Sequence, residues 1–109
     1  MTGEQEFVDR RRIRLIEICE ACHKNNLSSE IRARGHATLV YIGLDSLIEA
    51  LGAFPQYSDC MTKLLDARHE LPRREKFSGK EYPLLSAQEK QRIVEDLIGG
   101  AGRILHLLT

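Results

Sequence analysis

The chain has 109 residues, of which 42% are hydrophobic, 29% charged and 6% aromatic. This length suits a single domain, because two separate cores would each be too small to be stable. Its 16 basic residues balance its 16 acidic residues, which argues against the strong basic excess of a typical nucleic-acid-binding domain. Since no apolar run reaches the roughly 18 residues of a membrane span and Met1–Phe7 lacks an apolar signal core, we expect a cytoplasmic protein.

Four helices are predicted, with almost no strand signal. The first is expected over residues 4–24 and ends at the turn-favouring pair Asn25-Asn26. The second is expected over residues 29–52. The signals that mark its ends are two serines for the start, a glycine cap and a proline for the stop: Ser28, Ser29, Gly52 and Pro55.

The third helix is expected over residues 58–71 and the fourth over residues 86–108. Their end signals are a serine cap, a proline stop and a capping box: Ser58-Asp59, Pro72 and Ser86–Glu89. The long loop 72–85 between them is expected to be a crossover or an exposed, mobile excursion. The chain therefore predicts an all-α single domain over 1–109, similar to a four-helix bundle.

The second helix is apolar on two opposite sides. One side carries the residues expected in the core: Ala33, Ala37, Val40, Leu44, Leu47, Ile48 and Leu51. The far side carries a second stripe: Ile31, Gly35, Leu39 and Ile42. Such a helix is either surrounded by the other three or shared with a second chain, and we favour the second interpretation, with a homodimer as the expected assembly.

The residues expected to contact a partner or a second copy are apolar positions on faces that one core does not need, together with positions around the third helix that fit the core or a partner equally well. They are Ile13, Ile16, Ile31, Leu39, Ile42, Phe54, Tyr57, Met61 and Leu65. Docking through a few such side chains would block a surface that the partner protein needs. The sequence thus favours a non-catalytic, protein-binding regulator.

The glycines of the fourth helix, in Gly99-Gly100-Ala101-Gly102, cost about 1 kcal/mol each relative to alanine. They indicate either a kink or close backbone approach to a neighbouring helix, and the sequence leaves both open.

Cysteine chemistry has two candidate patterns. Cys19-Glu-Ala-Cys22-His23 matches the haem-attachment spacing, but its helical setting and the missing export signal argue against haem. A zinc site would have to add Cys60, and one C-x-x-C with a distant third thiol is only half of a tetrahedral set. We therefore expect buried, reduced thiols and no metal or cofactor.

Catalytic and nucleic-acid signals are weak. No phosphate loop, nucleophile elbow or helical H-E-x-x-H is present, so we expect no enzyme, although a nuclease using Arg and His from 32–36 or 68–70 is conceivable. The alternative to a protein-binding regulator is a helical nucleic-acid-binding module. It would use two basic clusters if they lay side by side: Arg10, Arg11, Arg12 and Arg14, and Arg73, Arg74, Lys76 and Lys80.

One segment suggests a family. Gly43–Pro55 resembles the late helix and Gly-x-x-Pro stop of TraM-type quorum-sensing antiactivators, and the length and all-helical make-up are similar to those of QslA-type antiactivators. The matching residues are Leu44, Ser46, Leu47, Ile48, Leu51, Gly52 and Pro55. The resemblance implies a helical homodimer that binds a LuxR-type transcription factor and inactivates it. It transfers no binding residue, because the matching positions are expected in the core and the cap.

Overall fold

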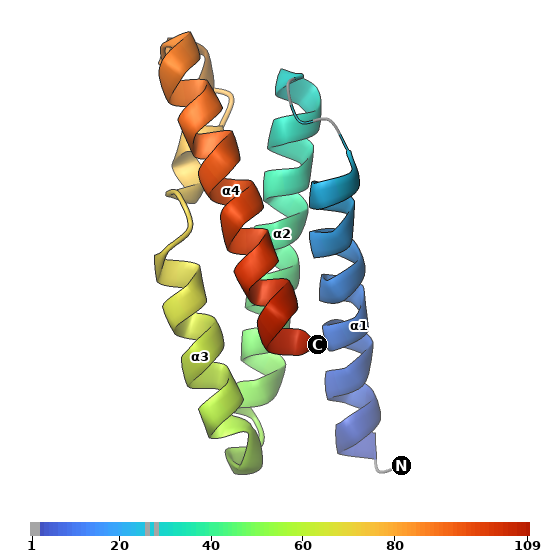
Figure 1. Ribbon diagram of the computed structural model, residues 1–109. Helices are drawn as coiled ribbons and strands as arrows, with labels where there is room; N and C mark the ends of the chain where they lie inside the picture. The colour runs from blue at the N-terminus through green and yellow to red at the C-terminus, as the bar shows by residue number, and fades with distance from the viewer. Residues whose placement is uncertain (1–2, 26, 28) are drawn as a thin grey trace.

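The computed structural model describes residues 3–25, 27 and 29–109. These residues form four α-helices and three short 3-10 helices, with no strand (Figure 1). The α-helices are α1 (Gly3–Lys24), α2 (Glu30–Gly52), α3 (Ser58–His69) and α4 (Ala87–Leu108). The 3-10 helices are η1 (Pro55–Tyr57), η2 (Arg74–Phe77) and η3 (Tyr82–Leu84). The predicted all-α, four-helix class is confirmed.

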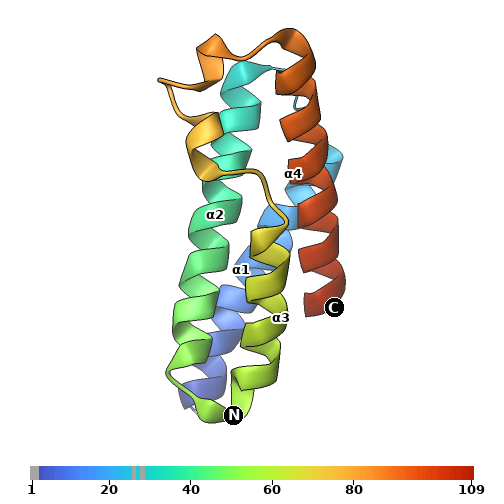
Figure 2. The same cartoon turned by 90° about the vertical axis from the view of Figure 1, so that its left-hand side faces the viewer.

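The four α-helices lie side by side in a narrow bundle that measures 47 × 23 × 21 Å. α1 packs against α2 and α4, and α3 packs against the same two helices from the other side. α2 and α4 consequently lie at opposite edges of the bundle (Figure 2). Among the described residues no helix is both long enough and apolar enough to cross a membrane.

The core consists of the expected apolar faces of the helices. Leu15 of α1, Leu44 and Leu47 of α2, Leu64 of α3 and Leu97 of α4 are almost completely shielded from solvent. Along α2 the buried residues Ala33, Ala37, Val40, Leu44, Leu47 and Leu51 recur every three or four positions, which places them on the side that faces the core.

The helix ends agree only in part with their predicted signals. Ser86 caps α4, since its Oγ accepts a hydrogen bond from the Glu89 amide at 3.1 Å, as expected of a capping box. Ser58, by contrast, is the first residue of α3 and not its cap, because the 3-10 turn η1 runs directly into the helix. Gly52 is not a left-handed cap either, because no described glycine has a positive φ. Asn26 and Ser28 lie outside the described residues.

The segment 72–85 is packed against the bundle and is not an exposed excursion, which corrects one of the two expectations. Two side chains of this segment, Phe77 and Tyr82, are buried. Arg34 Nε of α2 donates to the Phe77 carbonyl at 2.9 Å, and the Tyr41 hydroxyl donates to the Pro72 carbonyl. Two aromatic anchors and two hydrogen bonds therefore hold this segment on α2.

The glycines of α4 are explained by close approach at two of the three positions. A Cβ at Gly100 would lie 2.1 Å from Leu71 Cδ2, and one at Gly102 would lie 3.2 Å from His23 Nε2. At Gly99 the nearest atom would be 3.8 Å away. The close neighbours of Gly100 and Gly102 are side chains, so the space is taken by Leu71 and His23 and not by the backbone of a neighbouring helix.

Candidate functional site

The outer face of α2 carries the most prominent row of exposed apolar side chains on one helix. Ile31 is 84% exposed, Ile42 52% and Leu39 41%, and a Cβ at Gly35 would meet no atom within 4 Å. We call these four residues the outer stripe. Its spacing of three to four residues repeats with the helical turn, so the members share one face. This face belongs to the edge of the bundle that no other α-helix covers (Figure 2).

The open outer stripe decides between the two interpretations of the doubly apolar second helix. α2 is not surrounded by the other three helices, because its side opposite the core faces solvent in this chain. A folded monomer therefore leaves these residues unburied. The homodimer expected from the sequence stays a prediction.

The remaining predicted contact residues fall into two groups. Ile13 on α1 and Leu65 on α3 are exposed, by 49% and 37%. The others lie partly buried against the core: Ile16, Phe54, Tyr57 and Met61. The Phe54 ring stands between the rings of Phe7 and Tyr57, with centroid distances of 6.4 and 6.2 Å. This aromatic row closes one end of the bundle.

Most charged groups beside the outer stripe are paired. Arg34 reaches Glu30 at 3.4 Å, and Arg68 of α3 reaches Asp45 of α2 at 2.7 Å. The hydrogen bond to Asp45 raises the pKa of Arg68, which keeps that guanidinium charged. The Arg68–Asp45 pair joins α3 to α2, whereas Arg34 and Glu30 lie on the same helix.

A few exposed charges next to the outer stripe have no ion pair within the described part of the chain. Arg32 follows Ile31 directly, and Arg74 of η2 lines a shallow hollow together with Thr38 and Glu75. Glu49 lies two helical turns beyond Ile42. The outer stripe is therefore bordered by two guanidinium groups without an ion pair, and the carboxylates of Glu49 and Glu75 lie farther out.

The two basic clusters do not form one patch. Residues 10–14 lie in the N-terminal half of α1, whereas residues 73–80 lie on α2 towards the other end of the bundle, and both views separate them (Figures 1 and 2). Within the first cluster Arg12 pairs with Asp9 at 3.3 Å and Arg14 with Glu17 at 3.6 Å. The continuous phosphate-binding surface required by the nucleic-acid alternative is thus not built.

The thiols of α1 are held in their neutral form. Burial raises the pKa of Cys19 to about 12 and that of Cys22 to about 11. Cys22 Sγ lies 4.0 Å from His36 Nδ1, yet a thiol with a raised pKa supplies little of the nucleophilic thiolate. Cys60 is half-buried on α3. Nowhere in the described ranges do three or more His, Cys, Asp or Glu side chains converge as metal ligands would.

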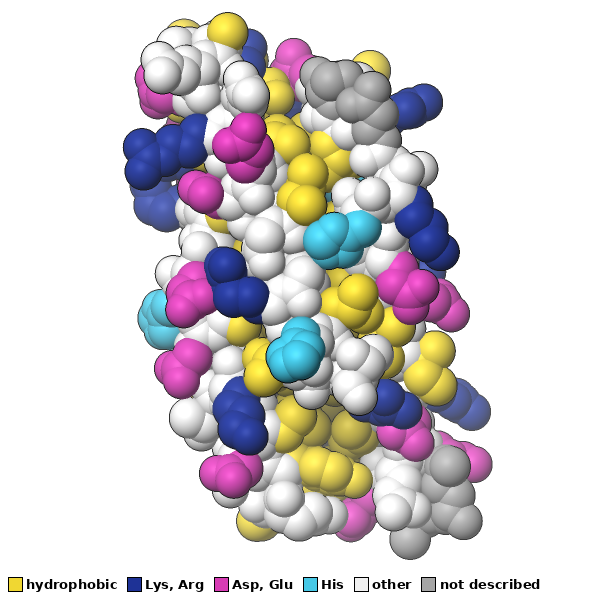
Figure 3. Space-filling model, in the orientation of Figure 1, with side chains coloured by type: hydrophobic (Ala, Val, Ile, Leu, Met, Phe, Trp, Pro, Cys, Tyr) yellow, Lys and Arg dark blue, Asp and Glu magenta, His cyan; other side chains and the backbone are white. Residues whose placement is uncertain are grey.

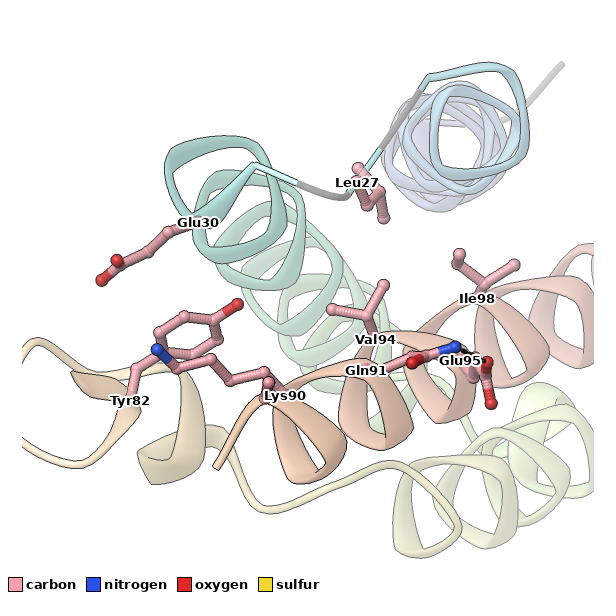
Figure 4. Close-up of a pocket in the computed structure, with 9 residues that line it drawn as sticks. Leu27, Glu30, Tyr82, Lys90, Gln91, Val94, Glu95 and Ile98 are labelled. Carbon is pink, nitrogen blue, oxygen red and sulfur yellow. Dashed lines mark hydrogen bonds between the residues drawn. The ribbon is translucent and has the colours of Figure 1, made fainter. Parts of the chain in front are cut away.

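Sequence reasoning missed a cavity of about 580 Å³ between the N-terminal half of α4, the start of α2 and Leu27 (Figure 4). Its walls come from residues that are far apart along the chain. They are Leu27, Glu30, Tyr82, Ala87, Lys90, Gln91, Val94, Glu95 and Ile98. No local pattern marks such a set, because it exists only once η3 and α4 are placed against α2.

Comparisons of the chain with protein-family models, curated proteins and solved structures gave no match.

Proposed function

We propose that the protein is a non-catalytic regulator that binds another protein through the outer stripe of α2. The occupant is an amphipathic helix of the partner, with its apolar side on Ile31, Leu39 and Ile42. Acidic groups along that helix would face Arg32 and Arg74. The mechanism is steric, since the bound regulator covers a helix that the partner needs for its own assembly.

The observation that carries the proposal is the exposure of three large aliphatic side chains in one row. Full burial of such a side chain contributes about 1.5–3 kcal/mol, so one helix laid on the stripe can be held by a few contacts. Amphipathic helices bind through apolar positions spaced three and four residues apart, as these are. Charged groups at the rim influence the association rate more than the affinity.

The resemblance to quorum-sensing antiactivators names the first partner to test. We propose a LuxR-type transcription factor, whose dimerisation or DNA binding would be lost when one of its helices is occupied. A second copy of this chain competes for the same face as an alternative occupant.

The test measures the affinity of the tagged chain for purified LuxR-type activators of its host. We expect Ile42→Asp to weaken binding by more than about tenfold, because a carboxylate on the stripe cannot be buried unpaired. Leu107→Asp is the matched control, since Leu107 is 40% exposed on α4, at the opposite edge of the bundle. Circular dichroism verifies that both variants keep their helices.

Equal affinities for the wild type, Ile42→Asp and Leu107→Asp would exclude the outer stripe as the partner surface. Light scattering tests whether a second copy of the chain, and not another protein, covers the outer stripe. If the chain is a dimer that Ile42→Asp converts to a monomer, a second copy covers the stripe.

A further inference from the structure

The cavity between α2 and α4 has the properties of a small-molecule site and plays no part in the proposed protein contact. Its volume of about 580 Å³ lies within the common range of ligand pockets, roughly 300–1,000 Å³. Leu27, Val94 and Ile98 direct aliphatic side chains into the gap between the helices (Figure 4). Leu27 lies on one side of the space, and Val94 and Ile98 of α4 lie on the other.

Tyr82 supplies a polar group inside this apolar space. The residue is only 4% exposed, and its hydroxyl points towards the gap (Figure 4). No described residue hydrogen-bonds to that hydroxyl. Burial and the nearby Glu30 raise the pKa of Tyr82, so the phenol keeps its proton and can donate it to an acceptor.

Lys90 is the cation on the wall of the cavity that has no ion pair among the described residues. Its Nζ lies 5.1 Å from the centre of the Tyr82 ring. A contact with the ring face leaves N–H groups of the ammonium available for a hydrogen-bond acceptor. Tyr82 and Lys90 are therefore two hydrogen-bond donors on the wall of the same pocket.

Both carboxylates on the wall already have donors. Glu30 pairs with Arg34 at 3.4 Å, and Glu95 accepts a hydrogen bond from the Gln91 amide at 3.2 Å. A cationic ligand would have to compete with these partners, whereas an anionic ligand would meet an unpaired ammonium. Gln91 is neutral, so Glu95 keeps its charge, and an anionic head group would have to lie at Lys90, away from Glu95.

We propose that this pocket binds a small amphipathic carboxylate, such as a medium-chain fatty acid. Its hydrocarbon chain would lie against Leu27, Val94 and Ile98. Its carboxylate would accept hydrogen bonds from the Tyr82 hydroxyl and the Lys90 ammonium. Charge-assisted hydrogen bonds of this kind fix the head group, while burial of the chain provides most of the affinity.

Octanoate, 1-octanol and octylammonium are suitable probes, since they share one chain and differ in the head group. Titrations of the full chain are followed by two-dimensional NMR of backbone amides and methyl groups. We expect saturable octanoate binding with the largest shifts at Leu27, Val94 and Ile98, and weaker binding of the two other probes. Lys90→Met should weaken octanoate binding roughly threefold to fivefold, as for a partly exposed ion pair.

Lys63→Met is the matched control, because Lys63 is an exposed lysine of α3 outside this cavity. A second variant, Val94→Trp, fills the space and should abolish binding while the helical spectrum stays unchanged. The proposal is overturned if octanoate does not saturate by about 10 mM, far weaker than typical ligand affinities. It is equally overturned if 1-octanol binds as well as octanoate, or if Lys90→Met and Lys63→Met behave alike.

Discussion

At the scale of single residues, three glycines on α4 that look alike in the sequence have different surroundings. Gly99 is exposed, with space for a methyl group, whereas Gly100 is buried beside Leu71, which follows α3 by two residues. Alanine is favoured over glycine in a helix by about 1 kcal/mol, so only the contact with Leu71 can reverse that preference. Gly100 is therefore a packing requirement, and Gly99 is not.

Replacing each glycine separately by alanine tests this distinction. We expect Gly99→Ala to raise the free energy of unfolding by about 0.5–1 kcal/mol and Gly100→Ala to lower it, because the new Cβ would displace Leu71. Urea denaturation measures both values, with the wild type as reference. Equal stabilisation by the two substitutions would show that Leu71 moves aside without cost.

At the scale of elements, the segment 72–85 behaves as part of the bundle despite its loop-like composition. Phe77 and Tyr82 stack with ring centroids 6.4 Å apart, and both are buried. The hydroxyl of Tyr41 holds the beginning of the segment through the Pro72 carbonyl. The segment contains several trypsin sites, at Arg73, Arg74, Lys76 and Lys80, that local unfolding must expose before cleavage.

Tyr41→Phe removes that hydroxyl and leaves the Pro72 carbonyl without its donor. We expect a loss of about 0.5–1.5 kcal/mol and faster trypsin cleavage within 73–80, because the segment then opens more often. Tyr57→Phe is the control, since Tyr57 is also partly buried but its hydroxyl has no hydrogen bond within the described residues. Mass spectrometry of the fragments locates the cuts, and equal rates for the two variants would contradict this role of Tyr41.

At the scale of the whole molecule, burial between the packed helices keeps one tyrosine hydroxyl and two cysteine thiols protonated. Burial raises the pKa of Tyr41 from 10.0 to about 12, as it does for Cys19 and Cys22 on α1. Each group is easier to ionise in the unfolded chain than in the folded chain. Their contribution to the free energy of unfolding is therefore fully present at neutral pH, where they are protonated in both the folded and the unfolded chain.

The sign of this effect predicts alkaline sensitivity. As the pH rises from the ordinary thiol value of 9.0 towards about 11, the unfolded chain releases the Cys22 proton first, so the free energy of unfolding should fall. Urea denaturation at a series of pH values measures the slope. Cys22→Ala should make the slope shallower, whereas the half-buried Cys60→Ala serves as control. An unchanged slope in Cys22→Ala would contradict this origin.

The candidate sites differ in how far the sequence predicts them. Ile31, Gly35, Leu39 and Ile42 can be identified as one face because the helical period alone aligns them, and their exposure follows from the position of α2 at an edge. The cavity cannot be identified in this way. Leu27, Tyr82 and Val94 belong to three segments whose proximity depends on how η3 and α4 pack against α2.

The sequence by itself determined the four helices, their apolar faces and the Ser86 cap, because periodicity and capping act over a few residues within one segment. Only the tertiary structure decided that segment 72–85 lies on the bundle, that Gly100 receives Leu71, and that Ser58 begins α3 without capping it. Each of these depends on which distant residues come into contact, and contact between distant segments follows from the packing of the whole core.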